Sequence, residues 1–314
     1  MCGCHLWIFE VGADADERCC AVLNSSERSR AEQYRLGDKA RQFRFARSIG
    51  RRLLGLYWDC DPSEVSWALT GPPDVKGPED TIALRASLSH SGQFVAVTVS
   101  RHAVFVGVDI EELDPPMQPE SLVNIAFTEE ERAQWACIAI EHRAEAMRRI
   151  WTVKEAVLKS PGRHEPRSVQ EARWLFRSTD PPDVKSFRGQ AEVRETGEIP
   201  AWQAVPTTTF LASSAAIVPL SQVRFDEPPG VLPLNDQTFV SRVCGTVAID
   251  PQVGELPVSE GFPSLRKKPF PANSADTVRY FEAFGVKAAI ADFPCPATIQ
   301  SPTPCSQSNP ESGL

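Results

Sequence analysis

Residues 107–116 of the chain read GVDIEELDPP, an apolar strand that ends in acidic residues. Side chains alternate between the two faces of a strand, so Asp109 and Glu111 point the same way while Val108 and Ile110 point the other way. Two like charges on one face repel each other unless a cation or basic groups lie between them. A strand end with solvated acids is the simpler alternative. The stretch therefore predicts a strand and raises the question of what its two acids face.

The residues around this stretch predict small sheets packed with helices. Strand patterns end at about residues 11 and 100, and a basic helical stretch covers about 25–58. Further helices are expected over about 119–136, where Thr128 and Glu131 have the spacing of a capping box, and over 143–159. Short strands are expected within 191–195, 201–205 and 209–218. The fold class predicted from this order is α/β, or more narrowly α+β.

The chain is divided here into an N-terminal lobe (1–103), a C-terminal lobe (104–219) and a tail (220–314). Residues 221–314 hold 13 of the 27 prolines, so the tail is expected to be partly disordered, with no role assigned. Two of its patches, 238–250 and 278–293, remain candidates for ordered structure. We expect a chain ending near Pro219 to fold and to keep its activity.

The composition is that of an ordinary globular protein of 314 residues with a net charge of -8. This acidic balance argues against a general nucleic-acid binder, which is usually basic. Residues 28–52 nevertheless hold nine Lys or Arg and only two acids, so they form either a phosphate-binding surface or a solvated helix face. Nine scattered cysteines without a C-x-x-C pair, and no apolar run of roughly 20 residues, lead us to expect a cytoplasmic protein without membrane contact.

Two further stretches carry polar groups suited to phosphate and metal chemistry. Residues 150–160 read IWTVKEAVLKS, and they place Glu155 and Lys159 four apart on one helix face. This pair is either a stabilising surface pair or part of an oxygen-rich Mg²⁺ site with a lysine for phosphate. Residues 88–92 read LSHSG, in which His90 and the small hydroxyls either bind a phosphate oxygen or are structural residues of a turn.

Taken in order, the motifs LSHSG, FVGVDIEE, FTEEER and WTVKEAVLK, with a basic D-x-x-R helix upstream, resemble the 4'-phosphopantetheinyl transferases of the surfactin-synthetase-activating type. The resemblance covers about residues 5–219. It implies a pseudo-symmetric monomer of two similar lobes, each a small sheet packed with helices, with coenzyme A bound between them. It also implies Mg²⁺-dependent transfer of 4'-phosphopantetheine from coenzyme A to a serine of an acyl or peptidyl carrier protein, releasing adenosine 3',5'-bisphosphate.

The resemblance assigns the acidic residues and one lysine to the reaction. Asp109, Glu111 and Glu155 would hold Mg²⁺ against the pyrophosphate of coenzyme A, and Lys159 would contact the phosphates. From its position one turn before Lys159 we also predict that Glu155 acts as the base, directly or through water, and a metal-bound water is the alternative. We expect Glu155, facing Mg²⁺ and Lys159, to stay ionised at neutral pH, because opposite charges favour its charged form.

The resemblance assigns the remaining polar residues to the nucleotide. Ser89 and His90 would bind its phosphate end, and Arg41 would reach the 3'-phosphate. Arg44 and Arg47 compete with Arg41 for this role, because the spacing within the helix does not separate them.

The chain departs from the pattern of the family on two loops. Residues 71–73 read GPP where many relatives have G-K-P, so a lysine contact is missing or is supplied by Lys76; residues 160–166 read SPGRHEP where many have G-x-G. The alternatives to a transferase are a non-catalytic coenzyme A or nucleotide binder and a metal-dependent phosphohydrolase. The three carboxylates and Lys159 favour the transferase, and the five scattered histidines disfavour the hydrolase.

Overall fold

The structure is a computed structural model of the chain. It describes residues 3–69, 75–79, 81, 84–100, 106–113, 119–159, 169–176, 189–193, 216–219, 243–249 and 274–294. Within these ranges the main sheets have four and three strands, in the orders β11-β1-β5-β4 and β6-β10-β9, and both are antiparallel. Helices pack against both, so the expected mixed α/β class is confirmed. No helix in the described ranges is both long enough and apolar enough to cross a membrane.

The four-stranded sheet is built around β1 (Gly3–Val11), which pairs with β11 (Val286–Pro294) on one side and β5 (Phe94–Ser100) on the other. Strand β4 (Arg85–Ser91) continues the sheet beyond β5. Residues 4–11 of β1 are all buried, which explains the nearly continuous apolar run that predicted this strand. Strands from both ends of the chain thus form a single sheet.

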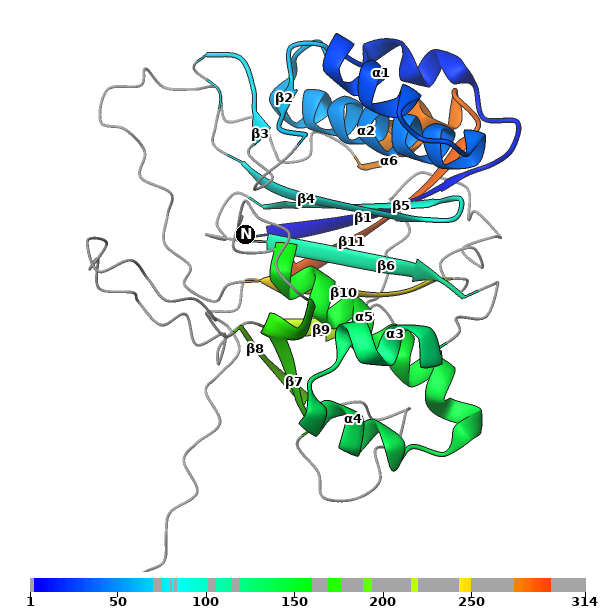
Figure 1. Cartoon of the computed structure of the whole chain (residues 1–314). Coiled ribbons are helices and arrows are strands. Elements are labelled where there is room, and N and C mark those ends of the chain that lie inside the picture. Colours follow the sequence, from blue (N-terminus) through cyan, green and yellow to red (C-terminus); the bar gives the residue numbers. More distant parts are fainter. Residues whose placement is uncertain are drawn as a thin grey trace, which may run out of the picture.

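One side of this sheet is covered by α1 (Ser25–Glu32), α2 (Gly37–Trp58) and α6 (Ser274–Glu282), which lie together at the top of Figure 1. The helical stretch expected over 25–58 is therefore two helices. A short 3-10 helix, Glu17–Val22, precedes them. The hydrophobic core between the helices and the sheet includes Trp7, Phe9, Ile49, Leu53, Val97 and Phe281.

Two arginines of α2 are buried, contrary to a fully solvated basic face. The carboxylate of Glu27, on α1, accepts from Arg47 Nε at 2.8 Å and from Arg51 Nε at 2.7 Å. The two guanidinium groups also donate to backbone carbonyls, that of Trp67 and that of Val65 respectively. Removing one partner of such a buried pair leaves an uncompensated charge, which is strongly destabilising.

The three-stranded sheet contains β6 (Val106–Glu112), β10 (Val243–Ile249) and β9 (Ala216–Pro219). Helix α5 (Arg143–Lys159) packs against β6 and β10. Helices α3 (Pro119–Ala126) and α4 (Glu129–Ala136) lie on the same side, below the sheets in Figure 1. The apolar residues between these helices include Phe127, Trp135, Met147 and Ile150.

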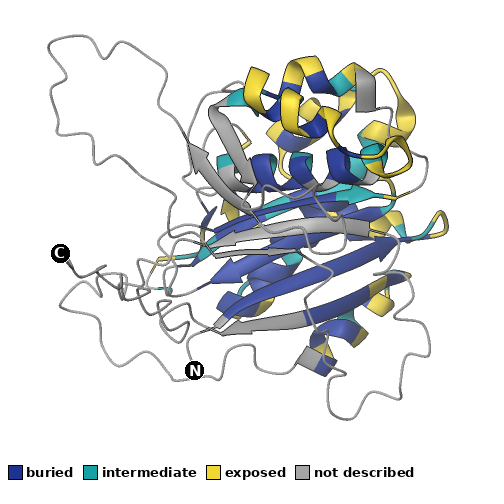
Figure 2. Ribbon diagram, turned by 90° about the horizontal axis from the view of Figure 1, so that it is seen from below, coloured by how far each residue is buried: buried dark blue, intermediate teal, exposed yellow. Residues whose placement is uncertain are grey.

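Smaller elements complete the described part of the chain. Two-stranded ribbons join β2 (Ser66–Trp67) to β3 (Val75–Lys76) and β7 (Ala172–Phe176) to β8 (Gly189–Val193), and short 3-10 helices span Ile140–His142 and Val169–Glu171. Viewed from below, the two main sheets are largely buried, whereas exposed residues gather on the outer faces of the helices (Figure 2). The strand expected over 201–205 lies outside the described residues.

The two main sheets meet where β6 lies parallel to β4. Backbone N–H groups of residues 108, 110 and 112 donate to the hydroxyl oxygens of Ser87, Ser89 and Ser91 at 3.1, 3.3 and 3.0 Å. Serine side chains therefore take the place that backbone carbonyls have in an ordinary ladder. Alternate residues of one strand face the same side, which is why the S-x-S-x-S pattern can follow β6 over its length.

The C-terminal region contributes to both sheets, which the proline-rich composition did not predict. Its two candidate patches form β10, α6 and β11. Val278 and Phe281 of α6 belong to the core beneath α2, and β11 pairs with β1 along the whole of both strands. The first sheet takes a strand and a helix from beyond residue 219, so the described fold does not support the expectation that residues 1–219 suffice.

We therefore predict that a chain ending at Pro219 is unfolded or insoluble. It would lose β10, which pairs with β6, and β11, which pairs with β1, and it would expose the apolar surface that α6 covers. Far-ultraviolet circular dichroism and thermal melting would measure this. A chain ending at Pro294 is the control and should melt like the full chain; a soluble 1–219 fragment with the same melting transition would contradict the prediction.

Candidate functional site

Asp109, at the centre of the opening motif, lies between a serine of β4 and a lysine of α5. Ser89 Oγ donates to Asp109 Oδ1 at 2.8 Å, and Lys159 Nζ donates to the same oxygen at 2.6 Å. The aspartate is only 4% exposed. Its second oxygen, Oδ2, is buried with no hydrogen-bond partner among the described residues. A buried carboxylate oxygen of this kind needs a further positive or hydrogen-bonding group.

Glu111 and Glu155 complete the acidic set that the motifs predicted. Ser91 Oγ donates to Glu111 Oε2 at 2.7 Å, so each acid of β6 is held by one serine of β4. Glu155 is on α5, one turn before Lys159, with 4.0 Å between its Oε2 and Lys159 Nζ. The expected placement of Glu155 and Lys159 on one helix face is thus confirmed, and the face points at β6.

Burial shifts the protonation equilibria of these acids upward. It raises the pKa of Asp109, Glu111 and Glu155, and the positive charge of Lys159 only partly offsets this. Burial alone would lower the pKa of Lys159, but the surrounding carboxylates outweigh it and the pKa rises. In the chain itself burial has a larger effect on the pKa of Glu155 than the charge of Lys159, and it makes this carboxylate more basic. The expectation that Glu155 stays ionised at neutral pH beside Mg²⁺ and Lys159 stays a prediction.

The donor set suits a divalent cation, although it does not form a closed cage. Carboxylate oxygens are the ligands that Mg²⁺ prefers, and the partnerless, buried Oδ2 of Asp109 is a suitable ligand atom. Among the residues that the structure describes, no three acidic, histidine or cysteine side chains are close enough to enclose an ion. Lys159 lies between Asp109 and Glu155 instead. The predicted Mg²⁺ ligation by Asp109, Glu111 and Glu155 stays a prediction.

Helix α5 is held in place by Lys154, the lysine of WTVKE. Lys154 is fully buried, and its Nζ donates to Glu131 Oε2 at 2.8 Å and to the Ala126 carbonyl at 2.7 Å. Burial lowers the pKa of Lys154, and the ion pair with Glu131 opposes this. Glu131 also closes the predicted capping box with Thr128, which is confirmed. The FTEEER and WTVKE motifs thus meet in a contact that orients Glu155 and Lys159.

Ser89 and His90 have different environments because they lie on opposite faces of β4. Ser89 is buried, and its hydroxyl donates to Asp109 rather than pointing at a nucleotide. His90 lies in the strand, not in the turn that the sequence suggested. Its Nδ1 is buried without a hydrogen-bond partner in the described part of the chain. Burial, with the charges of Lys159 and Lys39, lowers the pKa of His90 to about 4.

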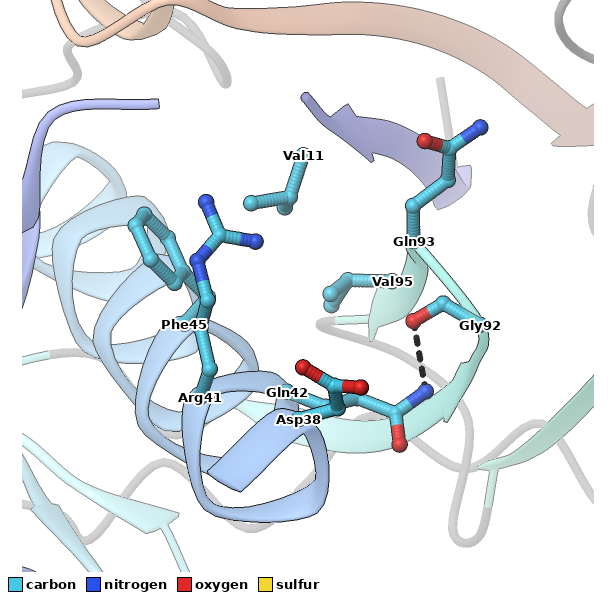
Figure 3. A pocket seen from close by; sticks show the side chains of 8 residues that line it. All are labelled: Val11, Asp38, Arg41, Gln42, Phe45, Gly92, Gln93 and Val95. Carbon is cyan, nitrogen blue, oxygen red and sulfur yellow. Dashed lines mark hydrogen bonds between the residues drawn. The ribbon is translucent and has the colours of Figure 1, made fainter. Parts of the chain in front are cut away.

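A pocket lies where the N-terminal turns of α2 approach the β4–β5 turn (Figure 3). Its volume is about 150 Å³, and it is lined by Val11, Asp38, Arg41, Gln42, Phe45, Gly92, Gln93 and Val95. Arg41 Nη2 donates to the carbonyls of Gly12 and Ala13 at 2.7 and 3.3 Å, and its guanidinium stacks on Phe45. Arg41 is thus a fixed cation at the edge of a pocket.

The structure distinguishes between Arg41, Arg44 and Arg47, which the spacing within the helix could not do. Arg47 is buried in its ion pair with Glu27, so it is not available to a ligand. Arg44 is partly exposed and contacts Glu17 at 3.5 Å, outside the set of residues that line the pocket. Only Arg41 of the three lines the described pocket.

Gly92 joins the pocket to the acidic end of β6. The carbonyl of Gly92 accepts from Gln42 Nε2 at 2.6 Å on the pocket side. Its φ is +54°, and a Cβ atom here would lie 1.5 Å from Glu112 Oε2. Only glycine fits this backbone and this close approach. Sequence reasoning missed Gln42 and Gly92 as site residues; the only available signal was the glycine ending the LSHSG motif.

The two loops that depart from the family pattern are not described by the structure, whereas Lys76 is. Residues 71–73 and 160–166 lie outside the described residues. Lys76 is exposed on β3 and does not line the pocket.

Comparisons with known proteins agree with the motifs. Residues 105–206 match the family model described as the 4'-phosphopantetheinyl transferase superfamily. The 4'-phosphopantetheinyl transferase HetI of Nostoc sp. is 30% identical over 162 residues, which are 50% of this chain and 68% of HetI. The 4'-phosphopantetheinyl transferases AcpT of Salmonella typhi and Escherichia coli K12 are 40% and 37% identical over 76 residues. Those 76 residues are 24% of this chain and less than half of either AcpT, at 39% and 38%.

The extent of the match to HetI and the position of the family model decide the family. HetI is matched over more than two thirds of its length. The family model covers β6 and α5, the elements that carry Asp109, Glu111, Glu155 and Lys159. On these grounds the chain belongs to the 4'-phosphopantetheinyl transferase superfamily.

Proposed function

We propose that the protein transfers 4'-phosphopantetheine from coenzyme A to a serine of an acyl or peptidyl carrier protein, releasing adenosine 3',5'-bisphosphate. The observation that carries this proposal is the path of charge from the pocket to the acids. Arg41 lines the pocket, the charges of Lys39 and Lys159 both act on His90, and Lys159 Nζ donates to Asp109 among the carboxylates. A ligand with two separated phosphate groups suits such a path.

Asp109, Glu111 and Glu155 would hold Mg²⁺ at the acidic end of this path. The bound ion would supply positive charge to the pyrophosphate of coenzyme A. Ser89 and Ser91 hold the two acids of β6 in place, which is the kind of support that metal ligands need from their neighbours. Ser89 would therefore support the metal site by donating its hydroxyl to Asp109, rather than by contacting the nucleotide directly.

In the proposed reaction the carrier serine oxygen attacks the β-phosphorus in line. A bond forms between them as the bond from this phosphorus to the oxygen of the adenosine 3',5'-bisphosphate breaks. Lys159 stabilises negative charge on the leaving phosphate. Glu155 accepts the serine proton, directly or through water; burial raises the pKa of Glu155, which suits a base.

Within the superfamily, we place the protein with the surfactin-synthetase-activating type and infer that it acts as a monomer. The support is that one chain supplies the serines of β4, the acids of β6 and the lysine of α5. No residue of a second copy is needed for these contacts.

The proposed activity predicts that an apo carrier protein incubated with coenzyme A and Mg²⁺ gains the mass of one phosphopantetheinyl group. Glu155→Gln should slow single-turnover transfer about 10²- to 10⁴-fold, the usual effect of losing a general base, while coenzyme A binding changes far less. Intact-mass spectrometry over a panel of carriers and calorimetry would measure both. Coenzyme A binding without transfer to any carrier would indicate a non-catalytic binder, and a wild-type rate in Glu155→Gln would place the base elsewhere.

Arg41→Ala is expected to weaken binding of coenzyme A about ten- to a hundredfold, as for loss of a hydrogen bond to a charged group. Binding of dephospho-coenzyme A, which lacks the 3'-phosphate, should change little. Arg44→Ala is the matched control, because Arg44 is on the same helix but outside the pocket lining, and it should affect neither ligand strongly. If Arg41→Ala lowers the affinity for coenzyme A and for dephospho-coenzyme A equally, Arg41 does not bind the 3'-phosphate.

Coenzyme A binding should take up protons through His90. Burial and the charges of Lys159 and Lys39 lower the pKa of the free imidazole to about 4, and a bound phosphate would raise it. Affinity should therefore increase as the pH falls from neutrality toward that value. Calorimetry at mildly acidic pH, in buffers of different ionisation enthalpy, would count the protons. The uptake should shrink in His90→Gln; an unchanged uptake would assign the protons to other groups.

A further inference from the structure

Two cations of α5 contact β6 or the residue that follows it, and no motif pointed to one of them. Arg148 is on the same helix as Lys159, three turns nearer its N-terminus, and it is only 6% exposed. Its Nη2 donates to the carbonyl of Leu113 at 3.1 Å, immediately after the end of β6. Its positive charge acts on Glu111 and opposes the effect of burial on the pKa of that carboxyl.

The two cations lie at opposite ends of the acidic segment. Lys159 contacts Asp109, whereas Arg148 contacts Leu113, so α5 runs antiparallel to β6. Eleven residues of helix span about 16 Å at roughly 1.5 Å per residue, and the four steps of strand from Asp109 to Leu113 span about 13 Å. The helix is therefore long enough to place one cation near each end of the acidic row.

This arrangement bears on metal binding, and it rests on the proposed function. We infer that Lys159 and Arg148 neutralise the carboxylates of the site from within the chain and compete with a divalent cation for them. Lys159 Nζ occupies the space beside Asp109 Oδ1 at 2.6 Å, and no three potential ligands gather around a common point in the described part of the chain. Tight metal binding then requires coenzyme A, whose pyrophosphate draws Lys159 away from Asp109.

In this inference Arg148 lowers the affinity of the site for a divalent cation without contacting the substrate. Its charge reduces the net negative charge of the acids at all times, whereas Lys159 can move to a phosphate. The metal site would then bind the divalent cation together with coenzyme A, whose pyrophosphate is the group on which the cation acts. The structural alternative is that Arg148 serves only to hold the end of β6 through the Leu113 carbonyl.

Manganese binding, followed by electron paramagnetic resonance of free Mn²⁺, tests the inference without measuring turnover. We expect coenzyme A to tighten Mn²⁺ binding by the wild-type protein about 5- to 150-fold, the usual range of coupling between two ligands. Arg148→Gln and Lys159→Gln should each bind Mn²⁺ more tightly than wild type when no coenzyme A is added. The affinity of coenzyme A itself for Mn²⁺, measured without protein, is subtracted.

Arg143→Gln is the matched control. Arg143 is also on α5 and donates to backbone carbonyls, those of Ile138 and Ala136, but it stacks on Trp135 away from the acids. It should lower the melting temperature without changing Mn²⁺ affinity. Arg148→Lys, which keeps the charge, should bind Mn²⁺ like wild type and so separate the charge from the hydrogen bond.

Three results would overturn the inference: equal Mn²⁺ affinity of the wild type with and without coenzyme A, unchanged or weaker binding in Arg148→Gln, or the same change in Arg148→Lys and Arg148→Gln. The transfer assay separates these from a failure of the proposed function. Transfer to a carrier without the coupling would refute this inference alone, whereas the coupling without transfer would refute the catalytic proposal alone.

Discussion

The junction between β4 and β6 is the constraint on which the site depends. Here three serine hydroxyls accept the N–H groups of β6, and two of them also donate to Asp109 and Glu111. A hydroxyl can accept and donate at once, which a backbone carbonyl cannot. The same contacts therefore join the two sheets and orient the acids. A chain with alanines in this row would leave buried N–H groups and carboxylates without partners at the same time.

Buried ion pairs hold the helices in place, as the serine row of β4 holds β6. Glu27 holds Arg47 and Arg51 on one side of the molecule, and Glu131 holds Lys154 on the other. Pairs of this kind cost desolvation energy and contribute little net stability compared with apolar residues, but they tolerate few alternative packings. In this protein they fix the two helices that carry the functional side chains, α2 with Arg41 and α5 with Glu155 and Lys159.

Much of the local structure was predictable because its causes are local. The bounds of α5, the Thr128–Glu131 capping box and the strand character of β1 and β6 follow from residues close together in the chain. Spacing also predicted that Asp109 and Glu111 share one face of a strand and that Glu155 and Lys159 share one face of a helix. The role of the C-terminal region was not, because β11 and α6 are stabilised by β1 and α2, more than 200 residues away in the chain. Proline content reports on the backbone of a segment and not on the partner it finds.

The sequence by itself determined the elements, the acidic motif and the superfamily that its motifs resemble, since these depend on periodicity and on the order of short stretches. Only the tertiary structure decided which of several equivalent side chains are available. Arg41 lines a pocket, whereas Arg47 is buried in an ion pair with Glu27, and the hydroxyl of Ser89 donates to Asp109. It also decided that burial outweighs charge at Glu155 and that Arg148 lies at the end of β6 that carries the acids. Burial and partnership between distant segments are properties of the packed chain, and no local pattern encodes them.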